Sequence, residues 1–418
     1  MKNAIATQIK NFFLPEPPNR SGIYSFRREK NGAITRFHLR VEKNGEGMLL
    51  ANSSIAARLS ASGTLIAKML LEGKTQNEIE TEVRKQFRKV PDQLLSEDID
   101  RVWQFIESLS NPDDTYPIFN LQDPALEPPR DLMAPLHAQI PVVSSEKTKT
   151  ILQKLWDAGI PHVTFEVLKE SSSDETVRCV QYAEDIGMIC GVRASGTWFQ
   201  QPDVMKSLAL AGIDYVVVPI VSAAKEKHDR IFGERDFEKA QQCINDCKRW
   251  EICGVVEVGI SHENRKEVAD LFTMLESKGI LNVHCFAVAE PVEKGLTGVE
   301  IIQTAVDVLS TASQLQMRVI WLPAVSRAGS LSEVLQAGPR TAGDVSVLVD
   351  AEGNVYPSRG PRTAAGNVLN TPWKTIWDSD VFRNYRYRVQ SNTHCSICPG
   401  LEICAADCPG DPQGWDSV

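Results

Sequence analysis

The 418-residue sequence predicts an α/β protein, with a small α+β domain before its central region and a cysteine-rich region after it. Three observations predict this order. Residues 136–325 alternate short Val- and Ile-rich segments with amphipathic helical segments. Residues 21–112 combine a β-hairpin pattern with three short helices. Residues 326–418 end in a run that holds four of the ten cysteines.

The composition narrows the classes of protein to which the chain can belong. It is 42% hydrophobic and 24% charged, with a net charge of −9, as expected for two or three globular domains. The N-terminal tail, residues 1–20, has no signal-peptide pattern, and no apolar run is long enough to span a membrane. We therefore expect a cytoplasmic protein without a membrane partner. The acidic balance argues against a nucleic-acid partner.

The first predicted domain, residues 21–112, begins with a hairpin. Residues 36–60 alternate polar and apolar side chains around a turn at Asn44 and Gly45. A helix follows that ends at Gly73, and Thr75 with Glu78 forms a capping box at the start of the next. A third helix is predicted to begin at Ser96. A hairpin with three short helices is a winged-helix-like unit.

These residues resemble a known family. The elements HLR, LLEGKT and the acidic helix after them are similar to a PqqD-like domain, also called a RiPP recognition element. The resemblance implies that the domain holds a precursor peptide by strand addition, and we expect the peptide along the hairpin between Phe37 and Leu50. A DNA-binding winged helix is the alternative. Its second helix is a poor phosphate-binding face, because acidic residues balance the basic ones there: Glu78, Glu80 and Glu82 against Lys74, Arg84, Lys85 and Arg88.

Residues 113–135 form a predicted linker, because Pro and Asp are too frequent there for a helix or a central strand. Seven strands and six helices alternate after it. The strands are predicted at 137–143, 162–168, 188–194, 215–221, 254–260, 283–288 and 318–325. The helices are predicted at 144–158, 174–186, 202–211, 237–250, 264–278 and 298–316. Repeated β-α units of this kind predict either a doubly wound sheet or a complete or partial barrel.

The segment LALAGIDYVVVPIVSAAKEKHDRIFGERDFEKA resembles the middle of the radical-SAM barrel, and Asn264 matches a recurring Asn of that family. The resemblance implies a partial (β/α) barrel over residues 136–325. It also implies a C-x3-C-x2-C cluster motif after the first strand, which this chain lacks. The first strand passes directly into the helix from Ser144, and no cysteine stands between Met1 and Arg178. The family's Gly-Gly-Glu turn after the second strand is missing too. We therefore do not expect S-adenosylmethionine to be a cofactor.

Other residues of the central region are weaker candidates. Cys243, Cys247 and Cys253 could supply three metal ligands, although buried cysteines on a helix and a strand are more often core residues. A re-purposed enzyme could use polar residues at the barrel mouth, for which the candidates are His137, Glu166, Arg193, His228 and Asp229.

Residues 326–418 resemble the SPASM domain through the run SVLVDAEGNVYPS and the final C-x2-C-x5-C-x3-C. The full pattern of that family has seven cysteines for two clusters, and here Arg340 and Ser358 occupy two of those positions. The four remaining cysteines are predicted to hold one [4Fe–4S] cluster, with a zinc site as the alternative: Cys395, Cys398, Cys404 and Cys408. In the two-cluster family, the cysteine at the position of Cys408 binds the other cluster. His394 could replace Cys408 as the fourth ligand.

Three functions remain open at this point. The first is a partner subunit without radical chemistry, which binds a precursor peptide, an active radical-SAM homologue or both. The second is an electron-transfer subunit. The third is the re-purposed enzyme at the barrel mouth.

Overall fold

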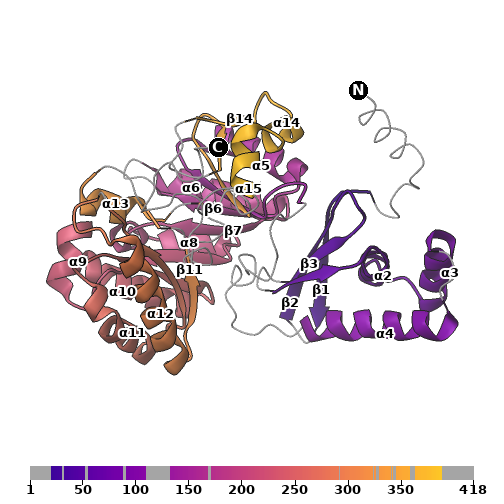
Figure 1. Cartoon of the computed structure of the whole chain (residues 1–418), viewed down its shortest axis with the longest axis horizontal. Helices are drawn as coiled ribbons and strands as arrows, with labels where there is room; N and C mark the ends of the chain where they lie inside the picture. The colour runs from indigo at the N-terminus through magenta and orange to yellow at the C-terminus, as the bar shows by residue number, and fades with distance from the viewer. Residues whose placement is uncertain are drawn as a thin grey trace. The chain divides into compact units, whose positions relative to one another are not determined.

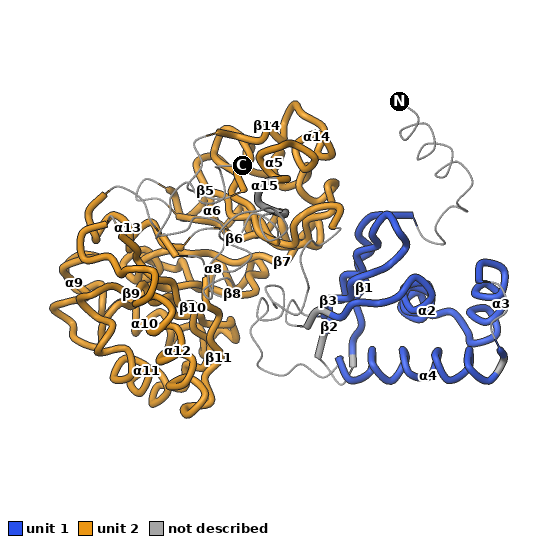
Figure 2. The backbone as a smooth tube through the Cα atoms, in the orientation of Figure 1, with its two compact units in different colours: residues 1–113 blue, residues 114–418 orange. Residues whose placement is uncertain are grey.

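The computed structural model describes residues 20–30, 33–51, 55–87, 91–109, 132–167, 171–290, 292–322, 324–325, 329–339, 341, 345–357 and 363–387. The chain divides into two compact units, residues 1–113 and residues 114–418, which are coloured separately in Figure 2. In the described part of the chain, every helix is too short or too polar to cross a lipid bilayer.

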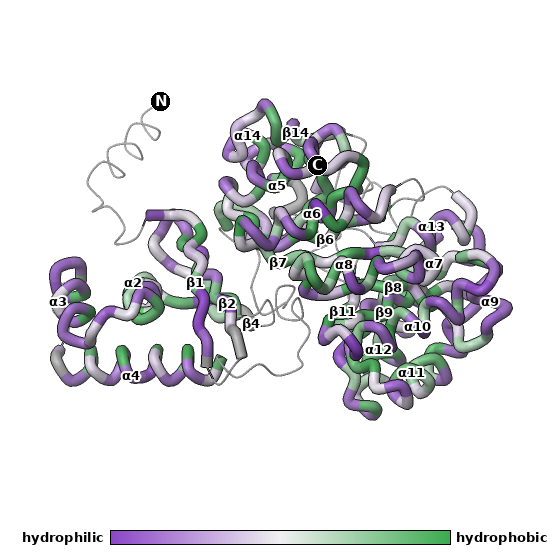
Figure 3. The backbone as a smooth tube through the Cα atoms, turned by 180° about the vertical axis from the view of Figure 1, so that it is seen from behind, coloured by the Kyte–Doolittle hydropathy of each residue, from purple (hydrophilic) through white to green (hydrophobic). Residues whose placement is uncertain are grey.

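In its described residues, the first unit contains one antiparallel sheet and three helices. The sheet runs in chain order through β1 (Gly22–Lys30), β2 (Ala33–Val41), β3 (Gly47–Ala51) and β4 (Ile55–Leu59). The helices α2 (Ala61–Leu71), α3 (Gln76–Gln86) and α4 (Asp92–Leu109) follow. The predicted capping box of α3 is present, because Thr75 and Glu78 exchange hydrogen bonds. In Figure 3, hydrophilic and hydrophobic residues alternate along α4, as expected for a helix with one buried face.

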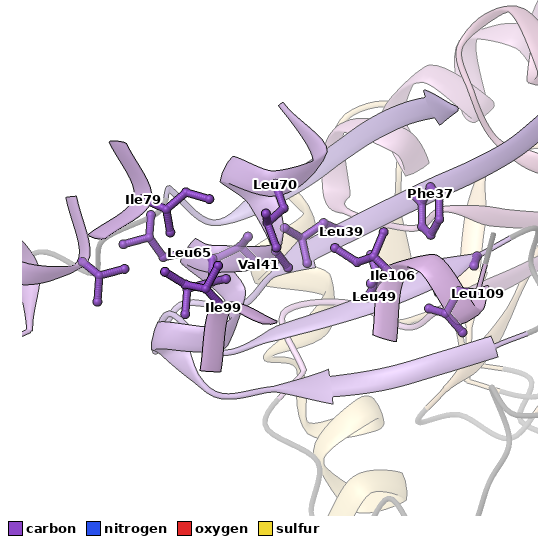
Figure 4. Packing of buried hydrophobic residues seen from close by; sticks show 14 of the residues in the cluster. Phe37, Leu39, Val41, Leu49, Leu65, Leu70, Ile79, Ile99, Ile106 and Leu109 are labelled. Atoms are coloured by element: carbon purple, nitrogen blue, oxygen red, sulfur yellow. The ribbon is translucent and has the colours of Figure 1, made fainter. Parts of the chain in front are cut away.

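One face of this sheet packs on the helices. Phe37, Leu39 and Leu49 point from β2 and β3 toward Leu65 and Ile106, and all five side chains are buried (Figure 4). Alternate residues of a strand point to opposite faces, so the apolar positions of β2 supply the sheet side of this core. With Ile79 and Val83 of α3, these side chains join two strands and three helices, so the unit has a hydrophobic core of its own.

The position that we expected for a bound peptide is wrong. The predicted hairpin exists, since Val41 pairs with Gly47 and Phe37 with Ala51. However, β2 also pairs with β1, and β3 also pairs with β4, so neither strand is an edge. The main-chain groups of β2 and β3 are already used inside the sheet and cannot receive an added strand. The pattern of the sequence did not reveal β1 and β4, and it placed the start of α4 at Ser96 instead of Asp92.

The second unit is built on a large, mostly parallel sheet (Figure 1). Its seven barrel strands pair side by side in chain order: β5 (His137–Pro141), β6 (His162–Glu166), β7 (Ile189–Arg193), β8 (Tyr215–Pro219), β9 (Cys253–Ile260), β10 (Asn282–Ala287) and β11 (Arg318–Trp321). Within the described residues β5 and β11 do not pair, so the barrel is open. Of the predicted partial barrel, the structure thus confirms the large, mostly parallel α/β sheet.

Helices connect these strands. They are α5 (Ser145–Ala158), α6 (Ser173–Asp185), α7 (Gly196–Phe199), α8 (Val204–Leu210), α9 (Lys225–Phe232), α10 (Asp236–Arg249), the 3₁₀ turn η1 (Arg265–Glu267), α11 (Val268–Ser277), α12 (Gly298–Gln314) and α13 (Leu331–Ala337). Glycine ends α5 as the sequence predicts, because Gly159 has a φ of 97°, a conformation that side chains with a Cβ rarely adopt.

The sheet continues beyond residue 325, where the sequence predicts a domain boundary. The strand β12 (Ser346–Val349) pairs in parallel with β5, and β13 (Asn354–Tyr356) and β14 (Gly366–Asn367) extend the sheet in antiparallel fashion. Among the described residues, two helices follow, α14 (Trp373–Trp377) and α15 (Asp380–Tyr387). The Nε1 of Trp377 donates to the carbonyl of Leu132 at 2.7 Å, which anchors this region beside the entry to β5.

Candidate functional site

The cysteines Cys395, Cys398, Cys404 and Cys408, and the neighbouring His394, lie outside the described residues. Arg340 and Ser358 lie outside them too. The chemistry of the four cysteine side chains indicates which metal centres they can bind. Four thiolates within one short segment are the soft ligands that iron–sulfur clusters and structural zinc use. The residues present therefore fit one such metal centre.

The connection between β5 and α5 is short. The strand ends at Pro141 and the helix begins at Ser145, which leaves only Val142, Val143 and Ser144 between them. A C-x3-C-x2-C motif spans more residues than this connection contains, and none of the three is a cysteine. The position that would carry the radical-generating cluster is a tight turn into a helix.

The interior of the barrel holds a group of buried polar side chains that we call the interior cluster. Its members come from alternate positions of the strands β5 to β10, which point into the barrel. They are His137, His162, Thr164, Arg193, Tyr215, Glu257 and His284, and each is no more than 8% exposed. The interior cluster thus replaces the branched apolar side chains that usually fill such a barrel.

Part of the interior cluster is a chain of short hydrogen bonds. The hydroxyl of Tyr215 lies 2.6 Å from Nε2 of His162 and 2.6 Å from the hydroxyl of Thr164. The Thr164 hydroxyl lies 2.7 Å from Nε2 of His137. The ring of Tyr215 needs the space above Gly191, where a Cβ would lie 2.1 Å from the ring. These contacts join β5, β6, β7 and β8 across the barrel.

Two histidines of the interior cluster are held in the neutral form. Burial lowers the pKa of His137 to about 3. Burial, together with the nearby His137 and Arg193, lowers the pKa of His284 to about 3 as well. Neutral imidazoles can accept as well as donate hydrogen bonds, so both can take part in a fixed network at neutral pH.

Arg193 and Glu257 form a buried ion pair near the carboxyl ends of β7 and β9. Nη2 of Arg193 lies 2.6 Å from Oε1 of Glu257, and Nε lies 3.0 Å from Oε2. A two-point contact between guanidinium and carboxylate fixes both side chains in orientation. Glu166, at the end of β6, pairs in register with Arg193 and is also buried. Of the residues predicted at the barrel mouth, only Glu166 and Arg193 lie together there.

The other residues predicted at the mouth lie elsewhere. His137 begins β5 and so lies at the opposite end of the strands. His228 is buried on α9, between Phe232 and Phe237, with Nε2 at 3.1 Å from Oδ2 of Asp236. Asp229 accepts hydrogen bonds from the main-chain N–H groups of Arg235 and Phe237 at the start of α10. Both residues hold helices in place.

The three cysteines Cys243, Cys247 and Cys253 do not form a preformed metal site. Within the described part of the chain, no group of three or more His, Cys, Asp or Glu side chains is placed to hold a metal ion. Cys243 and Cys247 are buried on α10, and burial raises the pKa of the Cys243 thiol. They are core residues, the alternative that the sequence favours.

Asn264 is structural as well. Its Nδ2 donates to the carbonyl oxygens of Val221 and Gly259, each at 2.8 Å, and its Oδ1 accepts from the N–H of Ser261. The side chain therefore joins the ends of β8 and β9. The sequence analysis did not single out Tyr215, Glu257 or His284. Glu257 and His284 are polar residues inside apolar strands and Tyr215 begins one, and that signal could have identified them.

Parts of this sequence are similar to known proteins. Residues 341–408 match the SPASM iron–sulfur cluster-binding domain. This match includes the four candidate ligands. One curated relative, the AdoMet-dependent heme synthase of Methanosarcina barkeri, is 20% identical over 286 residues, which cover 63% of this chain and 81% of that protein.

Solved structures share the fold. Streptococcus suis SuiB bound to the precursor peptide SuiA is 11% identical, with a TM-score of 0.58 over 91% of this chain and 95% of that chain. SuiB bound to S-adenosylmethionine has a TM-score of 0.57, 11% identity and coverage of 88% and 93%. Together the comparisons show a SPASM iron–sulfur cluster-binding domain at residues 341–408 and a fold shared with SuiB.

Proposed function

We propose that this chain is an iron–sulfur protein of the radical-SAM/SPASM type that has no radical chemistry of its own and serves as a partner subunit in peptide or cofactor maturation. The observation that carries the proposal is the three-residue connection between Pro141 and Ser145. A cluster that cleaves S-adenosylmethionine needs three thiolates and one open iron, and this connection offers no thiolate.

The C-terminal cysteines would hold one [4Fe–4S] cluster, which can accept and donate single electrons when bound. The described part of the chain contributes an anchored region before these cysteines. Trp373 and Trp377 of α14 donate hydrogen bonds to the carbonyls of Met133 and Leu132, and they fix the region that leads to the cysteines. This anchoring supports a stable cluster-bearing module.

The first unit is proposed to bind the precursor peptide. The match to SuiB with its peptide covers 91% of this chain, and residues 114–418 make up less than three quarters of it, so the likeness extends into the first unit. Strand addition requires an edge strand, and among the described strands of this sheet the edges are β1 and β4. We propose that one of these two receives the peptide.

The radical chemistry is tested with the full-length protein, purified without oxygen and reduced by dithionite. The reference is a variant in which four cysteines are replaced by Ala: Cys395, Cys398, Cys404 and Cys408. We expect the unchanged protein to form no more 5′-deoxyadenosine from S-adenosylmethionine than this variant does. Addition of a complete radical-SAM homologue encoded nearby should give a co-purifying complex. Turnover by the pure protein would contradict the proposal, and a failure to bind any homologue would favour the electron-transfer alternative.

Peptide binding is tested separately, by hydrogen exchange of the full-length protein with and without the leader of a co-encoded precursor peptide. We expect affinity in the micromolar range, about −8 kcal/mol, and new protection confined to β1 or β4. Duplex DNA serves as the competing ligand. Salt-sensitive binding of DNA, with no protection by the peptide, would replace peptide recognition by the winged-helix alternative.

A further inference from the structure

The short helix α13 lies against the interior face of the barrel where the strands end. A Cβ placed on Gly259 would lie 2.2 Å from Cδ2 of Leu335 and 2.8 Å from the ring of Phe286. Gly259 and Phe286 are register partners at the ends of β9 and β10. Leu335, only 2% exposed, therefore fills the space that the missing side chain of Gly259 leaves open.

Polar contacts fix the carboxyl end of α13. The carbonyl of Gln336 accepts a hydrogen bond of 3.1 Å from Nη1 of Arg193, the residue that is paired with Glu257 inside the barrel. The side chain of Gln336 donates to the carbonyl of Ile231 in α9, the helix against which α13 packs. A Cβ on Gly338 would lie 2.3 Å from Nη2 of Arg193, so the chain passes directly over the guanidinium.

The same helix buries fewer apolar side chains than the strands beneath it. It has seven residues, and Val334 and Leu335 are its buried residues. Gly329 and Gly338 flank it, with φ values of 153° and 77°. Elements with few buried apolar contacts open at a lower free energy than the core strands, and glycines at both ends can absorb the backbone change.

The place of α13 is also where ligands bind in related architectures, since the carboxyl ends of the strands carry the binding sites of β/α barrels. We propose that α13 is a displaceable plug, which closes the mouth of the barrel and is latched by Arg193. In the closed state, Leu335 and the Gln336 carbonyl occupy the approach to the Arg193–Glu257 pair. This inference goes beyond the proposed partner role, which does not use the barrel mouth.

The test is hydrogen exchange of the full-length protein, followed at the amides of residues 334–338 and, for reference, at those of β9 and β10. We expect the plug amides to exchange at least about 100-fold faster than the protected amides of the two strands. Leu335→Ala should speed the plug amides by a further factor of about ten while the strands change less than about two-fold. The matched control is Leu331→Ala in the first turn of the same helix, which is half-buried and should leave the exchange pattern as it is.

A second variant addresses the latch. Gly338→Ala places a methyl group against the guanidinium of Arg193 and should speed the plug amides without altering the packing of Leu335. Plug amides that exchange as slowly as β9 and β10 in the unchanged protein would overturn the proposal. So would a Leu335→Ala variant in which plug and strands accelerate together, because α13 would then be part of the same cooperative unit.

Discussion

Arg193 at the end of β7 and Glu257 in β9 are joined across the intervening strand β8 by a buried two-point ion pair, with Nη2 of the arginine 2.6 Å from Oε1 of the glutamate. Arg193 is 8% exposed and Glu257 2%. A charge at such a position is stable only while its partner is present, because an isolated buried ion is poorly solvated. The pair therefore joins β7 to β9 near the carboxyl ends of the strands.

Loss of one partner should be costly. We predict that Arg193→Gln lowers the free energy of unfolding of the barrel by about 3–5 kcal/mol, because Glu257 would remain buried without a counter-charge. The double variant Arg193→Gln with Glu257→Gln should recover a large part of this loss. Urea unfolding, followed by circular dichroism, measures both effects.

The control for this prediction is Arg265→Gln, which removes an arginine from a pair with Glu300 in which both side chains are close to 30% exposed. Water screens such a pair, so Arg265→Gln should shift the midpoint of urea unfolding far less than Arg193→Gln does. Equal shifts for the two variants would show that the buried ion pair of Arg193 stabilises the protein no more than the exposed pair of Arg265.

The hydroxyl of Tyr215 is the centre of the interior hydrogen-bond chain. We predict that Tyr215→Phe destabilises the barrel by about 1–3 kcal/mol, because His162 and Thr164 lose a partner in a place that water does not reach. The ring itself stays, so packing against Gly191 is unchanged. Thermal unfolding measures the effect, and Tyr182→Phe, which removes a half-buried hydroxyl on α6, is the matched control. An unchanged transition for Tyr215→Phe would mean that the chain of hydrogen bonds adds nothing to stability.

The buried histidines predict a pH dependence. The pKa values of His137 and His284 are lowered to about 3, below the value of about 6.5 in an unfolded chain. Between these values the unfolded chain binds more protons than the folded one, so stability rises with pH from about 3 to 6.5 and is lost as the pH falls. Each histidine should contribute up to about 1.4 kcal/mol per pH unit in that window.

This dependence is measured by urea unfolding between pH 4 and pH 7, in steps of about one unit. His284→Gln removes one of the two groups and should flatten the slope, while its stability at pH 7 falls only through lost packing. His262→Gln is the control, because that side chain is 38% exposed beside Glu300. Identical slopes for the unchanged protein and His284→Gln would contradict burial of a neutral His284.

The β/α order of the second unit was predictable from local signals. Strands rich in Val and Ile alternate with helices that end at glycine, and Gly159, Gly187, Gly212 and Gly279 all take the positive φ that such an ending requires. These signals depend on residues near one another in sequence. The same holds for the hairpin of β2 and β3, whose turn lies at Asn44 and Gly45.

Other features depend on pairing that the sequence does not encode locally. The strand β1 was missed because its exposed face is charged, and its apolar residues, such as Tyr24 and Phe26, are too few for a clear pattern. His162, Thr164 and Tyr215 could be assigned to strands, but their meeting inside the barrel depends on the register between β6 and β8. The plug α13 was missed for the same reason, since its contacts to Gly259 and Arg193 span long stretches of chain.

The tail cysteines give the last prediction. Protein purified without oxygen should be brown, with about four irons per chain, because thiolates bind iron as a cubane cluster. Cys398→Ala and Cys404→Ala should each abolish the colour and the iron, since loss of one ligand leaves an iron open to solvent and oxidation. Iron analysis, absorbance near about 400 nm and electron paramagnetic resonance after reduction measure the result.

The control is Cys179→Ala. Cys179 is fully buried on α6, and burial raises the pKa of its thiol to about 12, so it stays protonated at neutral pH and is a poor metal ligand. This variant should keep all its iron, even if the small cavity left by the sulfur lowers stability slightly. Equal loss of iron from Cys179→Ala and Cys398→Ala would place the cluster elsewhere or tie it to folding alone. Stoichiometric zinc without iron, lost only in the tail variants, would keep these ligands and replace the cluster by a structural zinc site.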